Sequence, residues 1–361
     1  MRLCLVISSL DCGGAQRALT TMANHWAGQG REVHVLTLDA SGRAPFFPLR
    51  PEVSATALDL ARPTGSLHAK FADNARRVLA LRRELRRIQP GAIVSFLPTV
   101  SVLVILASLG LGANVVAAER TEPSRNRPGC VWELLRLATY PLARGVVVQT
   151  ERARRFFPRW LRPRVHVIPN PVPAPAALPA GPREPLVLGL GRLERLKGFD
   201  LLLRAFARIA PRHPGWRVCI LGEGQARAEL ERLVQECGLE SRAALPGLVA
   251  APGPWLARAE VFALPSRFEG FPNALCEAMA HGLAVVACDC PSGPAEIIRP
   301  GVDGLLVPAE NVDALAQTLD ALLGDEALRR RLAAQAPEVL ERFSVPTVMA
   351  AWGRLLFPER A

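Results

Sequence analysis

Short apolar runs alternate with helical stretches along the first half of the chain. The run at residues 3–7 is followed by a Gly13-Gly14 turn and by a helical pattern over residues 15–28. Further apolar runs predict strands at residues 32–38, 92–96, 114–118 and 145–149. Strands separated by helices are typical of a parallel sheet with helices on both faces. The first half of the chain is therefore predicted to form an α/β domain.

A proline-rich segment, PNPVPAPAALPAGPREP, interrupts this pattern at residues 169–185. Proline lacks the backbone N–H that helices and sheet ladders need, so we expect a semi-rigid, extended connector here. The pattern then restarts. It predicts strands at residues 186–190, 217–221, 243–245, 261–264 and 284–287, and helices at residues 199–210, 226–238 and 273–282.

This organisation predicts two Rossmann-like domains in a chain of 361 residues. We expect the first domain at residues 1–170, a linker at 171–185 and the second domain at 186–340, with a last helix at 341–361 packing back on the first domain. Open parallel sheets bind ligands at the carboxyl ends of their strands. Two such domains facing each other across a cleft would therefore hold a ligand between them.

Residues 265–298, PSRFEGFPNALCEAMAHGLAVVACDCPSGPAEII, carry the richest chemistry. Glu269 follows a predicted strand, and Glu277 lies in the first turns of a helix begun by Asn273, a good capping residue type. Gly270 and the helix start would bring backbone N–H groups near Glu269, so a diphosphate or sugar could approach closely. A carboxylate on an apolar face needs hydrogen-bond donors, and sugar or ribose hydroxyls are suitable ones. Two ordinary surface glutamates are the alternative for an isolated pair at this spacing.

A second cluster, GLGRLERLKGFD at residues 189–200, lies between a predicted strand and a predicted helix. Gly191 permits close backbone approach, and Arg192 and Lys197 place two cations at the carboxyl end of the strand. A charge-assisted contact with phosphate contributes about 1.5–3 kcal/mol. Two such cations can stabilise a departing nucleoside diphosphate without a metal, and no D-x-D metal triplet occurs in the chain.

Together with LGEG at residues 221–224, these two segments resemble the donor domain of family 4 glycosyltransferases, which have the two-domain GT-B fold. The resemblance is dense over residues 186–307 and reaches the first domain through SLDCGGAQRAL and AAERTEP. It implies transfer of a sugar from a UDP- or GDP-linked donor with retention of configuration, and no metal or other cofactor. In the usual proposal for the family, the leaving phosphate takes the acceptor proton on the same face. Glu269 would then orient or stabilise rather than attack.

The resemblance also implies roles for single residues. Arg192 and Lys197 would bind the donor diphosphate, Glu269 would contact the donor sugar, and Glu277 would hold the ribose hydroxyls. The expected catalytic residues are Glu269, Arg192 and Lys197. The other residues expected to bind the donor are Gly13, Gly14, Gly191, Gly222, Gly270, Phe271, Pro272 and Asn273.

In the first domain, the Gly13-Gly14 loop with Arg17 resembles a flexible family loop that meets donor phosphate or acceptor. A plain strand-to-helix turn is the alternative. Glu119 and Arg120 follow a valine-rich strand where many relatives carry a histidine that this chain lacks. They are expected on the acceptor side with Arg17, and the role of each stays open. The AAERTEP segment is similar to that of bacterial polysaccharide and lipid-linked oligosaccharide enzymes, which implies a glycan or polyprenyl-diphosphate acceptor.

The net charge of +11 comes mainly from arginine. Residues 73–88 and 152–164 are basic segments of the first domain, and an anionic inner leaflet would attract each basic residue by about 1 kcal/mol. Phe156, Phe157 and Trp160 are candidate interfacial anchors. For residues 73–88, an apolar stripe that faces the domain core is an equal alternative. The chain is thus expected in the cytoplasm, as a peripheral protein of the inner membrane.

An uncharged stretch at residues 99–118 has about the length of a membrane span. Glycines and an asparagine divide it, so we expect a short buried helix followed by a strand. The eight cysteines include no C-x-x-C pair and the six histidines share no spacing with acids, so no metal site or catalytic triad is predicted.

Three other classes of protein compete with this interpretation. A non-catalytic basic protein that binds membranes or nucleic acid would suit the charge, but no recognition helix, RNP motif or zinc spacing is present, and nucleic acid is not an expected partner. An NAD-dependent oxidoreductase would need G-x-G-x-x-G where the chain has SLDCGG, and only Asp39 lies near the ribose position. An inactive subunit of a glycan pathway would not need Arg192, Lys197 and Glu269.

Overall fold

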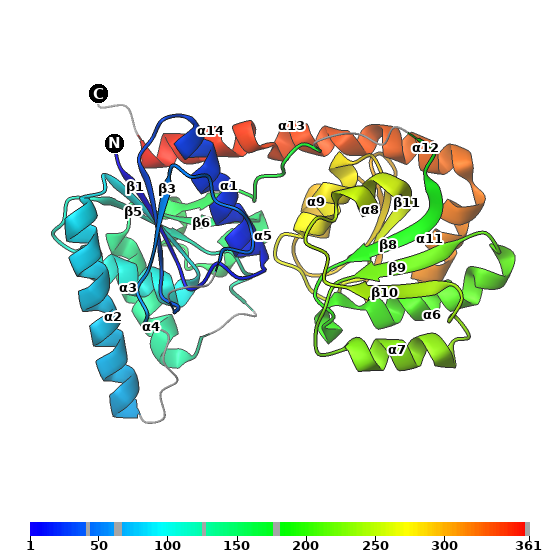
Figure 1. Cartoon of the computed structure of the whole chain (residues 1–361), viewed down its shortest axis with the longest axis horizontal. Coiled ribbons are helices and arrows are strands. Elements are labelled where there is room, and N and C mark those ends of the chain that lie inside the picture. The colour runs from blue at the N-terminus through cyan, green and yellow to red at the C-terminus, as the bar shows by residue number, and fades with distance from the viewer. Residues whose placement is uncertain (41–43, 61–66, 125–127, 176–180, 358–361) are drawn as a thin grey trace. The chain divides into compact units, whose positions relative to one another are not determined.

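The structure, a computed structural model, describes residues 1–40, 44–60, 67–124, 128–175 and 181–357, with the side chains of residues 67–70 excepted. The chain forms two compact units, Met1–Pro171 together with Val345–Ala361, and Val172–Ser344 (Figure 1). Part of the predicted linker, residues 176–180, lies outside the described residues. Both units are α/β, as the alternating pattern predicts.

The first unit is built on a parallel sheet with the strand order β3-β2-β1-β4-β5-β6-β7. Its strands are β1 (Leu3–Ile7), β2 (Val33–Thr37), β3 (Val53–Ala57), β4 (Ala92–Phe96), β5 (Asn114–Ala118), β6 (Gly145–Val148) and β7 (Val165–Val167). The strands predicted from apolar runs are confirmed to within a residue at each end. The edge strands β3 and β7 were missed, because β7 is only three residues long and Ser54 and Ala55 of β3 are exposed.

Helices cover both faces of this sheet. They are α1 (Gly14–Gly28), α2 (Leu67–Ile88), α3 (Pro98–Ser108), α4 (Cys130–Thr139), α5 (Glu151–Phe156) and α14 (Val345–Leu356). Leu3 and Leu5 of β1 belong to the core under α1 and α14, whereas Cys4 and Val6 belong to the core under α2 and α3. Trp352 of α14 is fully buried in the first of these cores. Because successive strand residues point to opposite faces, every side chain of β1 is buried.

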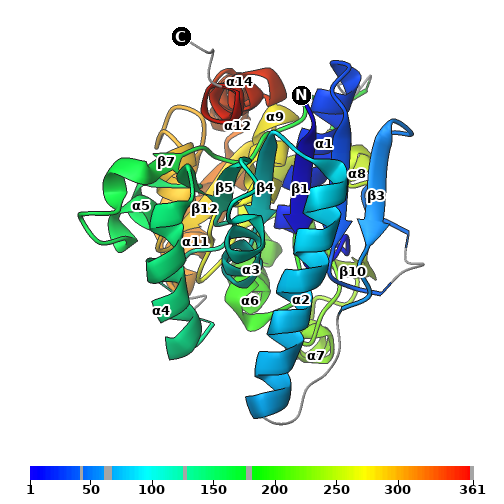
Figure 2. The same cartoon turned by 90° about the vertical axis from the view of Figure 1, so that its left-hand side faces the viewer.

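The uncharged stretch at residues 99–118 forms most of α3 and all of β5, so the expectation of a short buried helix and a strand is confirmed. α3 packs between α2 and α4 against the sheet (Figure 2). Within the described residues, no helix combines the length and the apolar character that crossing a membrane requires.

The second unit has a parallel sheet with the strand order β10-β9-β8-β11-β12-β13. Its strands are β8 (Glu184–Leu190), β9 (Arg217–Leu221), β10 (Ala243–Gly247), β11 (Ala259–Leu264), β12 (Ala284–Asp289) and β13 (Leu305–Pro308). Its helices are α6 (Phe199–Ile209), α7 (Arg227–Glu236), α8 (Gly253–Arg258), α9 (Asn273–Ala280), α10 (Pro294–Ile297), α11 (Val312–Gly324), α12 (Glu326–Gln335) and α13 (Val339–Phe343). The predicted elements are confirmed, and the edge strand β13 was missed.

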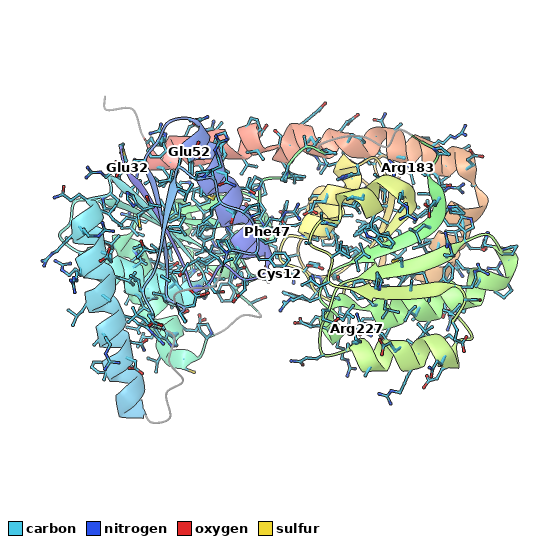
Figure 3. All side chains as sticks on the ribbon, viewed as in Figure 1. Cys12, Glu32, Phe47, Glu52, Arg183 and Arg227 are labelled. Carbon is cyan, nitrogen blue, oxygen red and sulfur yellow. The ribbon has the colours of Figure 1, made fainter. Side chains whose placement is uncertain are left out.

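Strand β8 is the centre of this unit. Val187 lies in the core that α6 and α11 cover, and Leu186 and Leu188 lie in the opposite core with α9. Arg183, just before β8 and labelled in Figure 3, donates hydrogen bonds to the carbonyl oxygens of Ala259 at 2.7 Å and His281 at 2.5 Å. Burial lowers the pKa of this arginine. These bonds fix the start of β8 against the start of β11 and the end of α9.

Candidate functional site

The loops after β8, β9, β11 and β12 meet at one edge of the second sheet, because these strands are parallel neighbours. The loops span residues 191–198, 222–226, 265–272 and 290–293. Together with the start of α9, they contain every donor-side residue that the sequence predicts in the second half of the chain.

Glycines let these loops approach one another. Gly222 has φ 146°, and a Cβ there would lie 1.8 Å from the carbonyl oxygen of Gly191. Gly198 has φ 67°, and a Cβ there would lie 2.0 Å from the carbonyl oxygen of Pro265. Both contacts are with backbone atoms, which cannot turn aside as a flexible side chain can. The loop after β8 therefore lies against the loops after β9 and β11 at positions that only glycine fits.

Arg267 fastens the loop after β11 to the loop after β8. Its guanidinium donates to both carboxylate oxygens of Asp200 at 2.7 Å each, and to the carbonyl oxygen of Arg195 at 2.8 Å. Its backbone N–H donates to the carbonyl oxygen of Leu196 at 2.9 Å. Burial raises the pKa of Asp200, but the hydrogen bonds and charge of Arg267 outweigh burial and hold that pKa below its ordinary value. The two loops are thus fixed side by side.

This arrangement brings Lys197 and Glu269 together. The Lys197 ammonium donates to Oε1 of Glu269 at 2.7 Å and to Oε2 at 2.9 Å, and the Ser266 hydroxyl donates to Oε1 at 2.7 Å. Only 6% of the Glu269 side chain is exposed, against 22% for Lys197. Arg192 is not among the contacts of Glu269. Its side chain is 69% exposed and pairs with Glu194 at 2.8 Å.

Helix α9 begins four residues after Glu269. Glu277, 5% exposed, lies one turn into the helix. Asn273 is the first residue of α9, so the predicted helix start is confirmed, but Pro272 rather than Asn273 occupies the N-cap position. Phe271 packs edge-to-face on Phe343 with the ring centroids 5.5 Å apart, so its side chain belongs to the core.

The loop after β12 contacts the backbone of the Glu269 loop. The Ser292 hydroxyl donates to the carbonyl oxygen of Glu269 at 2.7 Å. A Cβ at Gly293 would lie 2.8 Å from Cδ of Pro272 and 3.1 Å from the carbonyl oxygen of Gly270. The backbone of residues 269–272 is thus held by direct contact with a second loop.

Sequence reasoning missed the residues that assemble this cluster, namely Asp200, Ser266, Arg267 and Ser292. All of them lie inside the two segments that carry the resemblance, so the segments were the available signal. Their pairing was not readable, because Arg267 and Asp200 are far apart in sequence and meet only where β8 and β11 lie side by side.

The predicted first-domain loop follows β1. Gly13 has an extended backbone, and Gly14 is the first residue of α1. The backbone N–H of Arg17 donates to the carbonyl oxygen of Gly13 at 3.0 Å, and the Arg17 guanidinium lies 5.8 Å from the ring centre of Phe47. Figure 3 labels Cys12 and Phe47 at this end of the first unit. The loop is therefore a strand-to-helix turn with its arginine near an aromatic ring, and its expected contact with donor phosphate or acceptor stays a prediction.

Glu119 directly follows β5, and its side chain lies in the core of the first unit. It accepts a short hydrogen bond from the Tyr140 hydroxyl and lies 3.6 Å from Nη1 of Arg136. None of the Glu119 side chain and 1% of the Arg136 side chain is exposed. Burial raises the pKa of Glu119, and the charge of Arg136 opposes that rise. This carboxylate is thus enclosed by side chains of its own unit, and its expected place on the acceptor side stays a prediction.

Arg120 is also buried, on the opposite face of the same strand end. Its Nη1 donates to the carbonyl oxygen of Ile168 and to Oδ1 of Asn170, at 3.1 Å each. The guanidinium lies between the rings of Phe96 and Trp352, at 5.7 and 5.1 Å from their centres. Burial lowers its pKa to about 9. Arg120 therefore links the segment after β7, through Ile168 and Asn170, to the core that contains Trp352 of α14.

The two basic segments of the first unit, residues 73–88 and 152–164, bury some of their apolar side chains and expose others. The stripe of Leu81, Leu85 and Ile88 on α2 is buried in the core, so of the two alternatives for residues 73–88 the core-facing stripe is confirmed. Arginines on the other side of α2 are exposed: Arg76, Arg83, Arg86 and Arg87. Phe157 is fully buried, so the expectation that it anchors in a membrane is wrong, whereas Trp160 is 61% exposed.

Two family models match the chain. One, described as Glycosyltransferase Family 4, matches residues 12–174, and the other, described as Glycosyl transferases group 1, matches residues 184–325. The two matches together span both structural units.

The chain is 28% identical to a Campylobacter jejuni protein, GalNAc-alpha-(1->4)-GalNAc-alpha-(1->3)-diNAcBac-PP-undecaprenol alpha-1,4-N-acetyl-D-galactosaminyltransferase, over 99% of this chain and 98% of that protein. It is 32% identical to an exopolysaccharide phosphotransferase of Streptomyces coelicolor over 96% of this chain, and it spans 39% of the length of that relative. Among solved structures, the fold is similar to that of Anabaena Alr3699/HepE in complex with UDP and glucose, with a TM-score of 0.81, 19% identity and 99% of each chain covered.

Proposed function

Because the chain belongs to family 4 of the glycosyltransferases and has their GT-B fold, we propose that it transfers a sugar from a UDP- or GDP-linked donor to a glycan or polyprenyl-diphosphate-linked acceptor. The transfer retains the anomeric configuration and needs no metal ion. The observation that carries this proposal is the buried contact of Lys197 and Ser266 with Glu269, at the carboxyl edge of the second sheet. That edge is where parallel α/β sheets bind their ligands.

The donor diphosphate would lie at the Gly191 and Gly222 backbone. Lys197, and Arg192 on its long exposed side chain, would neutralise the charge that develops on the leaving phosphate, which is the work a metal does elsewhere. Glu269 is already oriented by hydrogen bonds, so it can accept from a sugar hydroxyl without reorganising. The leaving phosphate oxygen takes the acceptor proton on the face it leaves, which gives retention.

The names of the similar proteins favour a choice of substrates. The Campylobacter jejuni relative is named for the transfer of N-acetylgalactosamine to a polyprenyl-diphosphate-linked glycan, and the Anabaena structure contains UDP and glucose. We therefore rank UDP-sugars before GDP-sugars and polyprenyl-diphosphate-linked glycans before free glycans.

A panel of UDP-, GDP- and ADP-sugars tests the proposal. Each is assayed for hydrolysis and for a rise in melting temperature, and the best donor is then combined with polyprenyl-diphosphate acceptors. One nucleotide class should stabilise the protein and be turned over, the rate should survive EDTA, and the new linkage should keep the donor's configuration. Inversion of configuration or loss of the rate in EDTA would contradict the mechanism. The absence of both turnover and thermal stabilisation with every donor would contradict the function.

We also propose that the first unit docks on an anionic membrane, at the cytoplasmic face of the inner membrane. Exposed apolar side chains accompany the exposed arginines of α2, with Leu79 67% exposed there and Val131 and Leu134 of α4 exposed by 71% and 68%. Because α3 contacts both α2 and α4, these side chains belong to one side of the sheet. Basic and apolar groups together suit an anionic lipid surface.

Sedimentation with vesicles of phosphatidylcholine, with and without phosphatidylglycerol, tests the docking. The protein should bind the anionic vesicles, and Arg83→Glu with Arg86→Glu should weaken binding. Arg330→Glu, in the second unit and 80% exposed, is the control and should bind like the wild type. A protein that ignores anionic vesicles at low and at physiological salt does not dock.

A further inference from the structure

Two buried serines hold Glu269 from different loops. The Ser266 hydroxyl donates to its carboxylate at 2.7 Å, and the Ser292 hydroxyl donates to its backbone carbonyl oxygen at 2.7 Å. Ser266 is fully buried and Ser292 is 8% exposed. Glu269 is therefore held at both its carboxylate and its main chain, and neither hold faces water.

Lys197 also contacts this carboxylate, but the proposed function gives it a second task. An ammonium has three N–H groups, and in the structure it directs two contacts at Glu269, at 2.7 and 2.9 Å. A donor diphosphate would draw the same ammonium toward its phosphates. The Ser266 hydroxyl has one proton and is shielded from solvent, so its bond to Glu269 is the one that persists when Lys197 turns to the donor.

The backbone at Ser292 is in an unusual conformation. Its φ is 66°, a region that residues with a side chain seldom adopt. The hydroxyl that reaches Glu269 also lies 2.8 Å from the carbonyl oxygen of Pro291, so its single proton is shared. The next residue, Gly293, touches the Glu269 loop at Pro272 and Gly270. A strained residue and a close backbone contact thus occur together where the loop after β12 meets Glu269.

We propose that Ser266 and Ser292 are positioning residues for Glu269, the first for its carboxylate and the second for its main chain. Neither serine touches the sugar. Both act by keeping the Glu269 carboxylate aimed at the donor sugar while Lys197 serves the diphosphate. This inference rests on the proposed function, because it concerns the same donor site.

Ser266→Ala tests the first serine. With the donor that the panel selects, kcat should fall about 10- to 100-fold, the range expected for one lost hydrogen bond to a charged group, and KM for the donor should rise. Affinity for the nucleoside diphosphate should stay unchanged and affinity for the intact sugar nucleotide should fall, because only the sugar needs Glu269. Ser266→Thr, which keeps a hydroxyl, should recover most of the rate. An unchanged kcat in Ser266→Ala overturns the proposal, and so does an equal loss of affinity for both nucleotides.

The control is Ser108→Ala in the first unit. Ser108 is also buried and its hydroxyl donates to a backbone carbonyl, that of Ile105 at 2.9 Å, but it belongs to the other unit and this bond stays within α3. It should keep the wild-type rate. If Ser266→Ala does not melt cooperatively, Ser266→Cys carries the test, because the thiol keeps the volume and donates only weakly. The rate of that variant should again fall and its melting temperature should stay near the wild-type value, and a wild-type rate would overturn the proposal.

Two variants separate the hydrogen bond of Ser292 from its backbone conformation. Ser292→Ala loses the hydroxyl and keeps a side chain at positive φ, whereas Ser292→Gly loses the hydroxyl and relieves the backbone. Both should lower kcat by about 3- to 10-fold, as expected for a neutral hydrogen bond. Full activity in Ser292→Gly would mean that the hydrogen bond does not position Glu269. A wild-type enzyme that is inactive with every donor would instead contradict the proposed function itself.

Discussion

Each unit of this protein holds a buried glutamate paired with a cation beyond the carboxyl end of a sheet strand. In the first unit, Glu119 follows β5 and lies near Arg136. In the second unit, Glu269 follows β11 and contacts Lys197. The residue types and their places in the topology are alike, but the two pairs differ in their surroundings.

The difference lies in what covers each pair. The Arg136 guanidinium lies 5.2 and 5.4 Å from the ring centres of Phe156 and Phe157, and the pair is sealed from solvent. Around Glu269, the neighbouring loops are lined by glycines, and Lys197 keeps 22% of its side chain exposed. The first pair is thus enclosed by the core of its own unit, whereas the second lies in the loops where the proposed function places the donor.

The largest difference between the two pairs is expected from a substitution at Glu269. Glu269→Ala should lower kcat/KM by about 100- to 1,000-fold or more, because it removes a fixed group at the reacting sugar. The melting temperature should stay near the wild-type value, since the variant also removes a buried charge. Initial rates with the selected donor and thermal melting check both halves of this expectation. Full activity would remove Glu269 from the site.

The matching experiment in the first unit is Arg136→Met. It leaves Glu119 buried without its cation, so the free energy of unfolding should fall by about 3–5 kcal/mol. Urea unfolding measures this loss, and assays below the melting transition should show a nearly unchanged kcat. Adding Glu119→Gln should recover much of the stability, because the uncompensated charge is gone. A loss of kcat without a loss of stability would make Glu119 part of the catalytic site.

A substitution at Arg192 tests whether this arginine of the second unit belongs to the donor site. Its side chain is 69% exposed, so Arg192→Ala should leave stability unchanged. If it contacts the donor phosphate, kcat/KM should fall about 10- to 100-fold. Arg195→Ala is the matched control, an exposed arginine three residues away in the same loop. Equal rates for the two variants would show that Arg192 is an ordinary surface arginine.

The smallest effect is expected at Asp200, which supports the site without touching it. Its pKa is held below its ordinary value of 3.8 in the folded state. The Arg267 pair therefore contributes stability above that pH and loses it as the pH falls through the lowered pKa. Asp200→Asn should destabilise the protein by about 1 kcal/mol near neutral pH. Urea unfolding from about pH 6 to about pH 3 should show the two proteins converging in acid, and a pH-independent difference would contradict the pairing.

Prediction from the sequence worked best for elements with a strong local pattern. Strands β1, β4 and β5 are short, mostly apolar runs, and their bounds were predicted residue for residue. It failed at the edge strands β3 and β7, where half of the residues are exposed and the apolar signal is short. It also failed at Phe157, which looks like a surface aromatic in a basic segment but packs 6.2 Å from Tyr140 in the core.

The donor-side cluster shows the same limit. The sequence placed Lys197 and Glu269 in two loops at strand ends, and the parallel sheet brings them within hydrogen-bond distance. It did not indicate that Arg267 would reach Asp200 or that Ser292 would support Glu269. Those contacts depend on which strands become neighbours, and β8 and β11, which bring Asp200 and Arg267 together, are not consecutive in the chain.

The sequence by itself determined the alternation of strands and helices, the restart after the proline-rich segment and the residues at the donor-side strand ends. These follow from local properties: the period of apolar residues, the backbone limits of proline and glycine, and the charge of side chains. Only the tertiary structure decided that Glu119 lies in a core and that Glu269 lies among glycine-lined loops beside the partly exposed Lys197. Burial is set by side chains from distant segments, aromatic rings over Arg136 and bare glycine backbone beside Lys197, and no local pattern carries that information.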